Sequence, residues 1–290
     1  MVRLGANQYG KAEVRVVHVS RGAGPEGSDL VRDWNVSSSL SGDLAAAHLT
    51  GDNSRVLPTD TQKNTVYGLA KKLGGIEPEA FALELAAHYT GGQEAISRAR
   101  ITIQEYPWIR VSGTGHSFTR SGQYTRTVTV IDDAGLGRSV VGGVGDLIVL
   151  NTAGSQFWGF ARDEYTTLED AYDRMLATVV SARWRFRQPD ADWGAAFQAA
   201  KAALIEAFAQ TESYSLQQTL YAMGSAIVTA VPQICEVRLA LPNKHHFLVD
   251  LAPFGLANEN EVYYAADRPY GLIEGTVLAD DAPDAGIAWS

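Results

Sequence analysis

Two hydrophobic periodicities alternate along this chain, and their order limits the possible folds more than any single residue does. Val14 and Val16 alternate with other residues as in a half-buried strand, whereas Phe81 and Leu85 recur at helical spacing. Gly74-Gly75 follows the first helical pattern as a stop signal. The first half is therefore predicted to hold two strands, two helices and two strands, over residues 13–20, 30–40, 59–73, 78–89, 100–111 and 123–132.

The second half repeats this order. Trp193, Phe197 and Leu204 belong to one apolar helical stripe, and Leu216 and Ile227 belong to another. Around these helices the sequence predicts strands over residues 139–152, 156–162, 179–187, 234–241 and 246–251. The doubled order predicts an α+β fold of two ββααββ-type units, with antiparallel sheets and the helices on one face.

A glycine-rich stretch, residues 135–145, is the best candidate for the junction between the two units. We predict a first domain over residues 1–137 and a second over residues 138–279. In the remaining stretch Asp280, Asp281 and Asp284 lie among alanine, proline and glycine. Residues 280–290 are therefore predicted to form a disordered acidic tail.

Composition and charge argue against several classes of protein. The net charge of −9 argues against broad nucleic-acid binding, which needs a basic face. No apolar run approaches the roughly 18 residues of a membrane span, and the N-terminus lacks the apolar core of a secretory signal. A single cysteine, Cys235, allows no intrachain disulfide, which fits a reducing compartment.

Three arginines alternate with aromatic residues near the middle of the second half. Arg183, Arg185 and Arg187 would share one face of a strand, and Trp184 and Phe186 would share the other. Buried cations are costly without partners. We therefore expect the arginine face to meet water, carboxylates or another subunit.

The run of residues 155–168 combines aromatic rings, cations and carboxylates in a passage predicted to change from extended to helical, with Arg174 on the helical part. Phe157 could stack on a flat molecule, and Arg174 could offer a planar fork of donors to its edge. The alternative is that Phe157, Trp158 and Phe160 are core aromatics beside a surface ion pair.

Other candidate residues are ambiguous when each is taken alone. Lys11 could be an ordinary solvated lysine, or a desolvated one that accepts a proton near neutrality. Thr59 and Asp60 could cap a helix, or mark a helix N-terminus that receives an anion. His245 and His246 are adjacent on a predicted strand and should point to opposite faces, so a shared metal is not expected.

Five separated motifs together resemble the urate oxidase (uricase) family, bacterial type. They are Tyr9-Gly10-Lys11, Thr59-Asp60, the run of residues 155–168, Leu216-Gln217 and Leu241-Pro242-Asn243-Lys244-His245. The resemblance spans residues 7 to about 278. It implies a tandem tunnelling fold (T-fold), a homotetramer around a tunnel, and active sites at subunit interfaces.

The same resemblance implies the reaction and the residues that perform it. Urate would react with O₂ to give 5-hydroxyisourate and hydrogen peroxide in purine catabolism, without a metal or other cofactor. The implied proton relay is Lys11, Thr59 and His245, with Lys11 as general base through Thr59. The implied substrate contacts are Thr59, Asp60, Phe157, Arg174, Leu216, Gln217 and Asn243.

Within that set the resemblance gives each group a task. Phe157 would stack on urate, and Arg174 and Gln217 would hydrogen-bond the purine edge. Asn243 would lie above the urate plane, where oxygen or water sits. The chain ends Ala288-Trp289-Ser290 and not Ser-Lys-Leu, so a cytoplasmic location is expected over a peroxisomal one.

Two other functions remain open at this point. One is a metal-dependent pterin or purine enzyme on the same fold, which would need clustered histidine and cysteine ligands. The other is a non-catalytic tetramer that binds a purine. Stoichiometric zinc would favour the first, and binding of urate without turnover would favour the second.

Overall fold

The computed structural model describes residues 2–266 and 268–290. In that part of the chain, nine strands form one sheet in which every neighbouring pair is antiparallel. The strand order is β1-β2-β3-β6-β7-β8-β9, and both β10 and β11 pair with β9. These strands are β1 Tyr9–Ser20, β2 Leu30–Gly42, β3 Ile96–Glu105, β6 Thr125–Asp133, β7 Gly137–Phe157, β8 Ala171–Phe186, β9 Ile234–Leu248, β10 Tyr263–Ala266 and β11 Leu272–Leu278.

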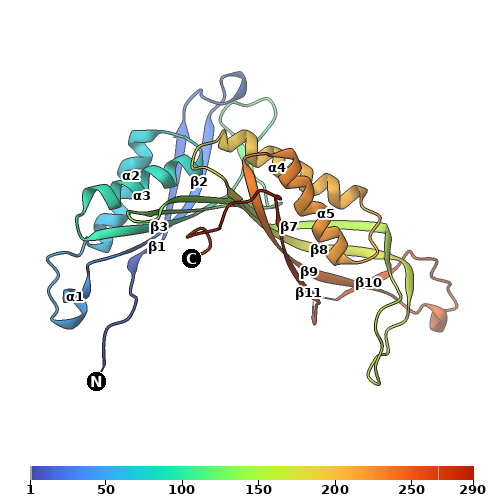
Figure 1. The fold of residues 1–290 in the computed structure, drawn as a ribbon. Helices are drawn as coiled ribbons and strands as arrows, with labels where there is room; N and C mark the ends of the chain where they lie inside the picture. Colours follow the sequence, from blue (N-terminus) through green and yellow to red (C-terminus); the bar gives the residue numbers. More distant parts are fainter. Residues whose placement is uncertain (1, 267) are drawn as a thin grey trace.

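Two pairs of helices cover one face of this sheet. Figure 1 shows them on the outer side of a curved sheet, one pair over each half, with the C-terminus beneath the arch on the other side. The helices are α2 Thr59–Leu73, α3 Pro78–Gly92, α4 Trp193–Gln210 and α5 Leu216–Ala230. The smaller elements are α1 Ala45–Leu49, the hairpin of β4 Trp108–Arg110 and β5 Phe118–Arg120, and two short 3₁₀ turns, η1 Pro25–Gly27 and η2 Ala252–Phe254.

The predicted α+β fold, with its doubled order of strands and helices, is confirmed. Alternation places Trp34, Val36 and Leu40 of β2 under the first helix pair, and Phe81 and Leu85 of α3 pack in the same core. The second helix pair buries the stripes that the sequence indicated. Both halves contribute to one continuous hydrophobic core.

The glycine-rich junction is part of the sheet. Residues 137–145 form the first part of β7, which pairs with β6 through a hairpin, so the two halves share one sheet. A Cβ on Gly142 would lie 2.7 Å from the Trp184 Nε1 atom, and one on Gly143 would lie 2.5 Å from the Ala182 carbonyl oxygen. These glycines therefore allow close packing inside a strand.

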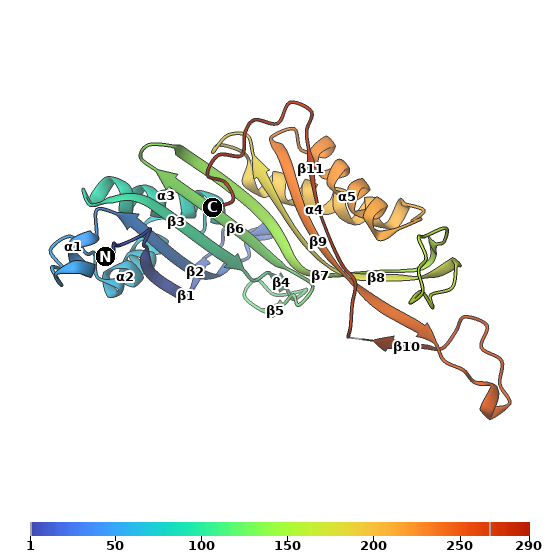
Figure 2. The same ribbon diagram turned by 60° about the horizontal axis from the view of Figure 1, so that its bottom comes forward.

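The strand around Arg174 differs from the prediction. Arg174 was expected on a helical segment, but residues 171–186 form the single strand β8, and β7 extends without interruption to Phe157. Residues 155 to 157 of β7 pair with residues 171 to 174 of β8. The extended pairing of two long strands beyond the core decides this geometry, which the local sequence pattern does not reveal. Figure 2 shows this end of the sheet reaching past the helices.

The alternating arginines obtain their partners on the concave face. Trp184 and Phe186 are buried under the helices. On the other face Arg185 donates from Nε to Glu236 Oε2 at 2.8 Å, with both side chains buried. Arg187 pairs with Asp281 at 2.5 Å. Carboxylates and the C-terminal segment therefore compensate the arginine row.

The acidic tail is ordered against the same face, unlike the disordered segment that was expected. The Arg185 guanidinium donates to the carbonyl oxygens of Pro283 at 2.8 Å and Asp284 at 3.2 Å. Ala288 is buried. The Trp289 ring lies 4.0 Å from the Arg238 guanidinium carbon, which fits a cation–π contact. Partners more than 40 residues away in sequence hold this tail, and composition alone cannot reveal them.

Candidate active site

Lys11 lies where β1 meets β2 at an irregular point. A Cβ on Gly10 would collide with the Ser38 backbone of β2, so only glycine permits this close approach. The register between the two strands then shifts after Lys11, and Glu13 has a positive φ of 58°. The Lys11 backbone N–H donates to Ser38 Oγ at 3.4 Å. The backbone of the Tyr-Gly-Lys motif is therefore fixed against β2, and the Lys11 side chain that it carries is half-buried.

Thr59 and Asp60 are held close to this lysine by a second strand-to-helix contact. The Tyr9 hydroxyl donates to the Leu57 carbonyl oxygen at 3.1 Å and accepts from the Leu57 N–H at 2.9 Å, which attaches the start of α2 to β1. The positive charge of Lys11 is among the causes that lower the pKa of Asp60, after the hydrogen bond and charge of Lys63.

The capping alternative for Thr59 and Asp60 is wrong. Pro58 is the N-cap residue of α2, and no side chain makes a cap hydrogen bond there. Thr59 is the first helical residue and is exposed. Asp60 pairs with Lys63 and accepts from Asn64 at 3.1 Å. Helix capping therefore does not account for Thr59, which faces solvent at a helix N-terminus.

A cavity of about 410 Å³ gathers the candidate residues of the second half. Its wall contains six of them: Phe157, Arg174, Leu216, Gln217, Asn243 and His245. They come from the end of β7, the start of β8, the first turn of α5 and the outer part of β9. Residues as far apart in sequence as Phe157 and His245, which are 88 positions apart, thus line one cavity of the size of a small molecule.

Phe157 and Arg174 present an aromatic face and a cation in this cavity. The Arg174 guanidinium carbon lies 5.2 Å from the centroid of the Phe157 ring. Phe160 stacks on Phe157 with centroids 5.0 Å apart and ring planes 11° from parallel. Arg162 lies over Phe160 at 4.6 Å. Phe157 is therefore a partly buried ring supported by a stack at the cavity edge, and not a residue of the main core.

The electrostatics of the cavity favour an anion. Burial lowers the pKa of the Arg174 guanidinium, which remains cationic because an arginine ordinarily titrates far above neutrality. Burial, followed by the positive charges of Arg174 and His246, lowers the pKa of His245. His245 is thus neutral at pH 7 and able to accept a proton.

Several residues of the cavity wall were not predicted from the sequence: Leu168, Ala171, Met175, His246, Phe247 and Ile273. Met175 follows Arg174 on β8, and alternation along a strand would place the two side chains on opposite faces, so this adjacency gave no signal. Ile273 lies on β11 and reaches the cavity only because β11 pairs with β9. No local signal identifies it. His246 contributes to the same wall as His245, although side chains of adjacent strand residues were expected on opposite faces.

The structure does not bring Lys11, Thr59 and Asp60 into this cavity. β1 is one edge of the sheet, and β8 is five strands away. At about 4.8 Å per strand this separation is roughly 24 Å. Figure 1 shows β1 and α2 at one end of the molecule and β8, β9 and α5 at the other. The candidate residues therefore form two half-sites: Lys11, Thr59 and Asp60, and the residues of the cavity.

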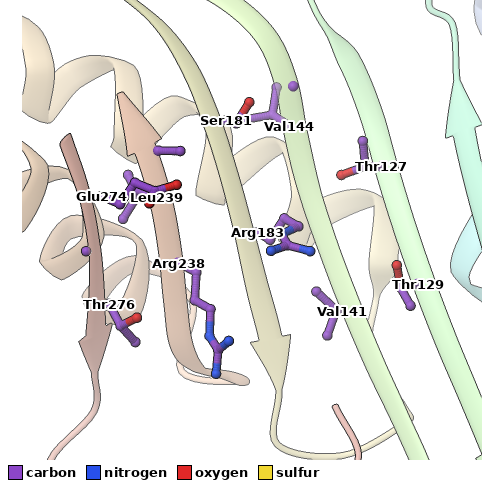
Figure 3. Close-up of a pocket in the computed structure, with 13 residues that line it drawn as sticks. Thr127, Thr129, Val141, Val144, Ser181, Arg183, Arg238, Leu239, Glu274 and Thr276 are labelled. Atoms are coloured by element: carbon purple, nitrogen blue, oxygen red, sulfur yellow. The ribbon is translucent and has the colours of Figure 1, made fainter. Parts of the chain in front are cut away.

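A second cavity, of about 630 Å³, lies on the concave face and contains none of the predicted catalytic or substrate-binding residues. Figure 3 shows Arg183 on β8 and Arg238 on β9 beside it, with Thr127 and Thr129 on β6. Glu274 of β11 lines the same cavity, so both arginines and a carboxylate lie on this part of the concave face. Among the described residues, no helix is long and apolar enough to cross a membrane. Within them there is also no group of three or more histidine, cysteine, aspartate or glutamate residues that could hold a metal ion.

Comparisons with known proteins converge on one family. A family model described as uricase matches residues 7–131 and 140–274. The uricase of Arthrobacter globiformis is 47% identical over 289 residues, covering 100% of this chain and 94% of that protein. The uricase of Dictyostelium discoideum is 36% identical over 283 residues, covering 96% of this chain and 98% of its own.

Solved structures agree with the fold. The crystal structure of the Arthrobacter globiformis uricase matches with a TM-score of 0.93, covering 98% of this chain and 97% of that one. A uricase from Bacillus fastidious matches with a TM-score of 0.82 at 23% identity, covering 94% of each chain. This second likeness concerns the fold alone.

Proposed function

Because the chain belongs to the uricase family, we propose that it oxidises urate with O₂ to 5-hydroxyisourate and hydrogen peroxide. The observation that carries the proposal is the cavity in which Phe157, Arg174 and Gln217 converge from separate elements. A flat, anionic, acceptor-rich molecule is the ligand that an aromatic face, a guanidinium and an amide together suit.

The reaction needs no oxidant besides O₂. Urate loses two electrons and gains the oxygen atom of a water molecule, and O₂ takes up two electrons and two protons to become peroxide. Removing a proton from urate makes it a better electron donor. The protein then has to orient the purine, accept the proton and support the developing charge, which we propose it does without a metal or flavin.

Each candidate residue has a place in that scheme. Arg174 and Gln217 hold the purine edge, and Phe157 lies against its face. Lys11 takes a proton through Thr59, and a neutral His245 completes the relay. The remaining contacts are assigned to Asp60, Leu216 and Asn243.

A complete site requires a second copy of the chain. The two half-sites lie five strands apart in one sheet, and in the part of the chain that the structure describes β1 pairs on one side only, with β2. Ile148 in the middle of β7 and Tyr172 at the start of β8 are exposed at 71% and 67%. Unpaired strand edges and exposed apolar side chains are typical of surfaces that another chain covers. We therefore propose a homotetramer around a tunnel, in which one copy brings Lys11, Thr59 and Asp60 to the cavity of its neighbour.

A cytoplasmic location remains a prediction. The single cysteine, Cys235, is buried and unpaired, which fits a reducing compartment.

Replacing Arg174 with alanine is expected to weaken urate binding by roughly 10–100-fold, because a charge-assisted contact disappears. Turnover at saturating urate should fall much less. The pKa of His245 should also rise, since the positive charge of Arg174 is one of the causes that lower it. Steady-state kinetics from about pH 5 to pH 8, a window that extends below the ordinary histidine pKa, would measure both effects. Unchanged urate binding would mean that Arg174 is structural.

The function itself is tested with chelator-treated protein. Loss of urate absorbance in the near ultraviolet, together with peroxide formation, is the expected result. Activity that appears only after a metal is added would favour the metal-dependent pterin or purine enzyme. Binding of urate without turnover under any condition would favour the non-catalytic purine-binding tetramer.

A further inference from the structure

Arg174 has an unusual environment for a ligand-binding arginine. In the part of the chain that the structure describes, burial is the cause that lowers its pKa, and no carboxylate offsets it. Its hydrogen-bond partner there is a hydroxyl: Arg174 Nε donates to Ser155 Oγ at 3.4 Å. With Nε directed to Ser155, the two Nη groups remain for a ligand.

Ser155 itself is held by the backbone on two sides. It is fully buried, and it pairs with Arg174 between two register shifts of the β7–β8 ladder. On its other side it forms an isolated bridge with Ser213. The neighbouring Gln156 N–H donates to the Ser213 carbonyl oxygen at 2.6 Å, and the Ser213 N–H donates to the Gly154 carbonyl oxygen at 3.0 Å. The backbone that carries the hydroxyl facing Arg174 is thus held in place.

Hydrogen bonds of buried hydroxyl groups connect Ser213, the bridge partner of Ser155, to α5. Thr219 Oγ1 donates to Ser213 Oγ at 2.8 Å, and Ser213 Oγ donates to the Ser215 carbonyl oxygen at 3.1 Å. Ser215 is the N-cap of α5, and its side chain accepts from the Gln218 N–H at 3.2 Å. The first two residues of that helix are Leu216 and Gln217. The contacts of Ser213 therefore hold in place both the end of β7, which carries Ser155, and the first turn of α5, which carries Gln217.

We propose that Ser155 is a positioning residue of the substrate clamp. It accepts the Nε–H of Arg174 so that the Nη1 and Nη2 donors face the purine edge, and the Ser155–Ser213 bridge sets their spacing from Gln217. The inference rests on the proposed function, because it takes urate as the ligand of this cavity. An arginine that needs no carboxylate for its orientation keeps its full charge for an anionic ligand.

The experiment compares Ser155→Ala with the wild-type protein, using anaerobic urate binding and aerobic kinetics. The variant should bind urate about tenfold more weakly, at the low end for a lost hydrogen bond to a charged group because the observed bond is long. The turnover number should change by less than about twofold, since no group that takes part in proton transfer is removed. Ser28→Ala is the matched control. It also removes a buried serine hydroxyl, one that donates to the Pro25 carbonyl oxygen at 2.7 Å in the other half of the chain, and it should leave urate binding unchanged.

A double-mutant cycle separates positioning from general structural damage. In an Arg174→Ala background, Ser155→Ala should have no further effect on urate binding, because the partner it positions is absent. An equal loss in both backgrounds would overturn the inference, as would normal binding by Ser155→Ala. If Ser155→Ala does not fold, Ser155→Cys keeps the shape of the side chain, with a somewhat larger sulfur that is only a weak acceptor in place of the hydroxyl, and should give the same loss of binding. Failure of the wild-type protein to bind urate would instead overturn the proposed function, and with it the role assigned to Ser155.

Discussion

Replacing Lys11 with alanine is expected to lower turnover of urate by roughly 10²–10⁴-fold, the usual contribution of a positioned general base. Lys11 is half-buried on a backbone that Gly10 and the shift in register hold in place. It lies near Asp60 at the exposed start of α2. Each copy should still fold, because the lysine side chain is not part of the hydrophobic core.

The measurement is the initial rate of urate loss at saturating urate, with the assembly state checked by light scattering. Lys72→Ala is a suitable control, because Lys72 is an exposed lysine in the last turn of α2. It should have normal turnover. Near-normal turnover of Lys11→Ala would contradict the assignment of Lys11 as the base.

Replacing Arg126 with methionine is expected to have the largest effect on stability. Arg126 is 4% exposed, and its guanidinium donates to Glu77 and Glu79 at 2.7 Å each and to Glu105 at 3.5 Å. It also lies 4.5 Å from the Phe197 ring of α4, so it joins the two halves of the molecule. Removing one partner from a buried charge cluster typically costs about 3–5 kcal/mol, because the opposite charges are left uncompensated.

Chemical denaturation of the purified assembly at pH 7 would measure this loss. Arg55→Met is the control: Arg55 pairs with Asp43, both side chains are exposed, and the cost should stay within about 1 kcal/mol. If both variants lost the same small amount of unfolding free energy, the structural role of Arg126 would be contradicted.

The pH dependence of the Arg126→Met variant gives a second test. Burial already raises the pKa of Glu79 to about 7, and losing Arg126 should raise it further. A carboxyl group whose pKa is higher in the folded than in the unfolded state binds more protons when folded. Stability therefore falls as the pH rises through the folded pKa. The free energy of unfolding that the variant loses relative to the wild-type protein should accordingly be larger at pH 8 than at pH 6.

Much of the fold could be predicted from local patterns. Val14 and Val16 alternate because one face of β1 is buried, and the stripe through Phe197 and Leu204 faces the sheet. The two predictions that were wrong, the helical position of Arg174 and the disordered tail, concern segments whose structure long-range contacts decide. Arg174 lies on a strand because β7 and β8 continue to pair beyond the core. The acidic tail is ordered because Arg185 and Arg238 bind it.

The candidate site was predictable only in part. The nine residues came from motif resemblance, and the structure brings six of them together in one cavity. That Lys11, Thr59 and Asp60 lie elsewhere follows from the strand order, which no residue pattern specifies. Ser155 could not be found from the sequence, because a buried serine has no signature until its register partner is known.

The most direct test of the shared site is complementation between two defective variants, assayed at a urate concentration well below the wild-type KM, where a loss of binding also lowers the rate. Lys11→Ala and Arg174→Ala are co-expressed with different tags, and mixed assemblies are isolated through both tags. If each site combines Lys11 of one copy with the cavity of its neighbour, a mixed pair contains one intact site and one doubly altered site. Random mixing should then restore about one quarter of the wild-type sites. If Lys11 and Arg174 of the same copy served one site, every site would carry one lesion. Activity no higher than that of the separate variants would contradict the account.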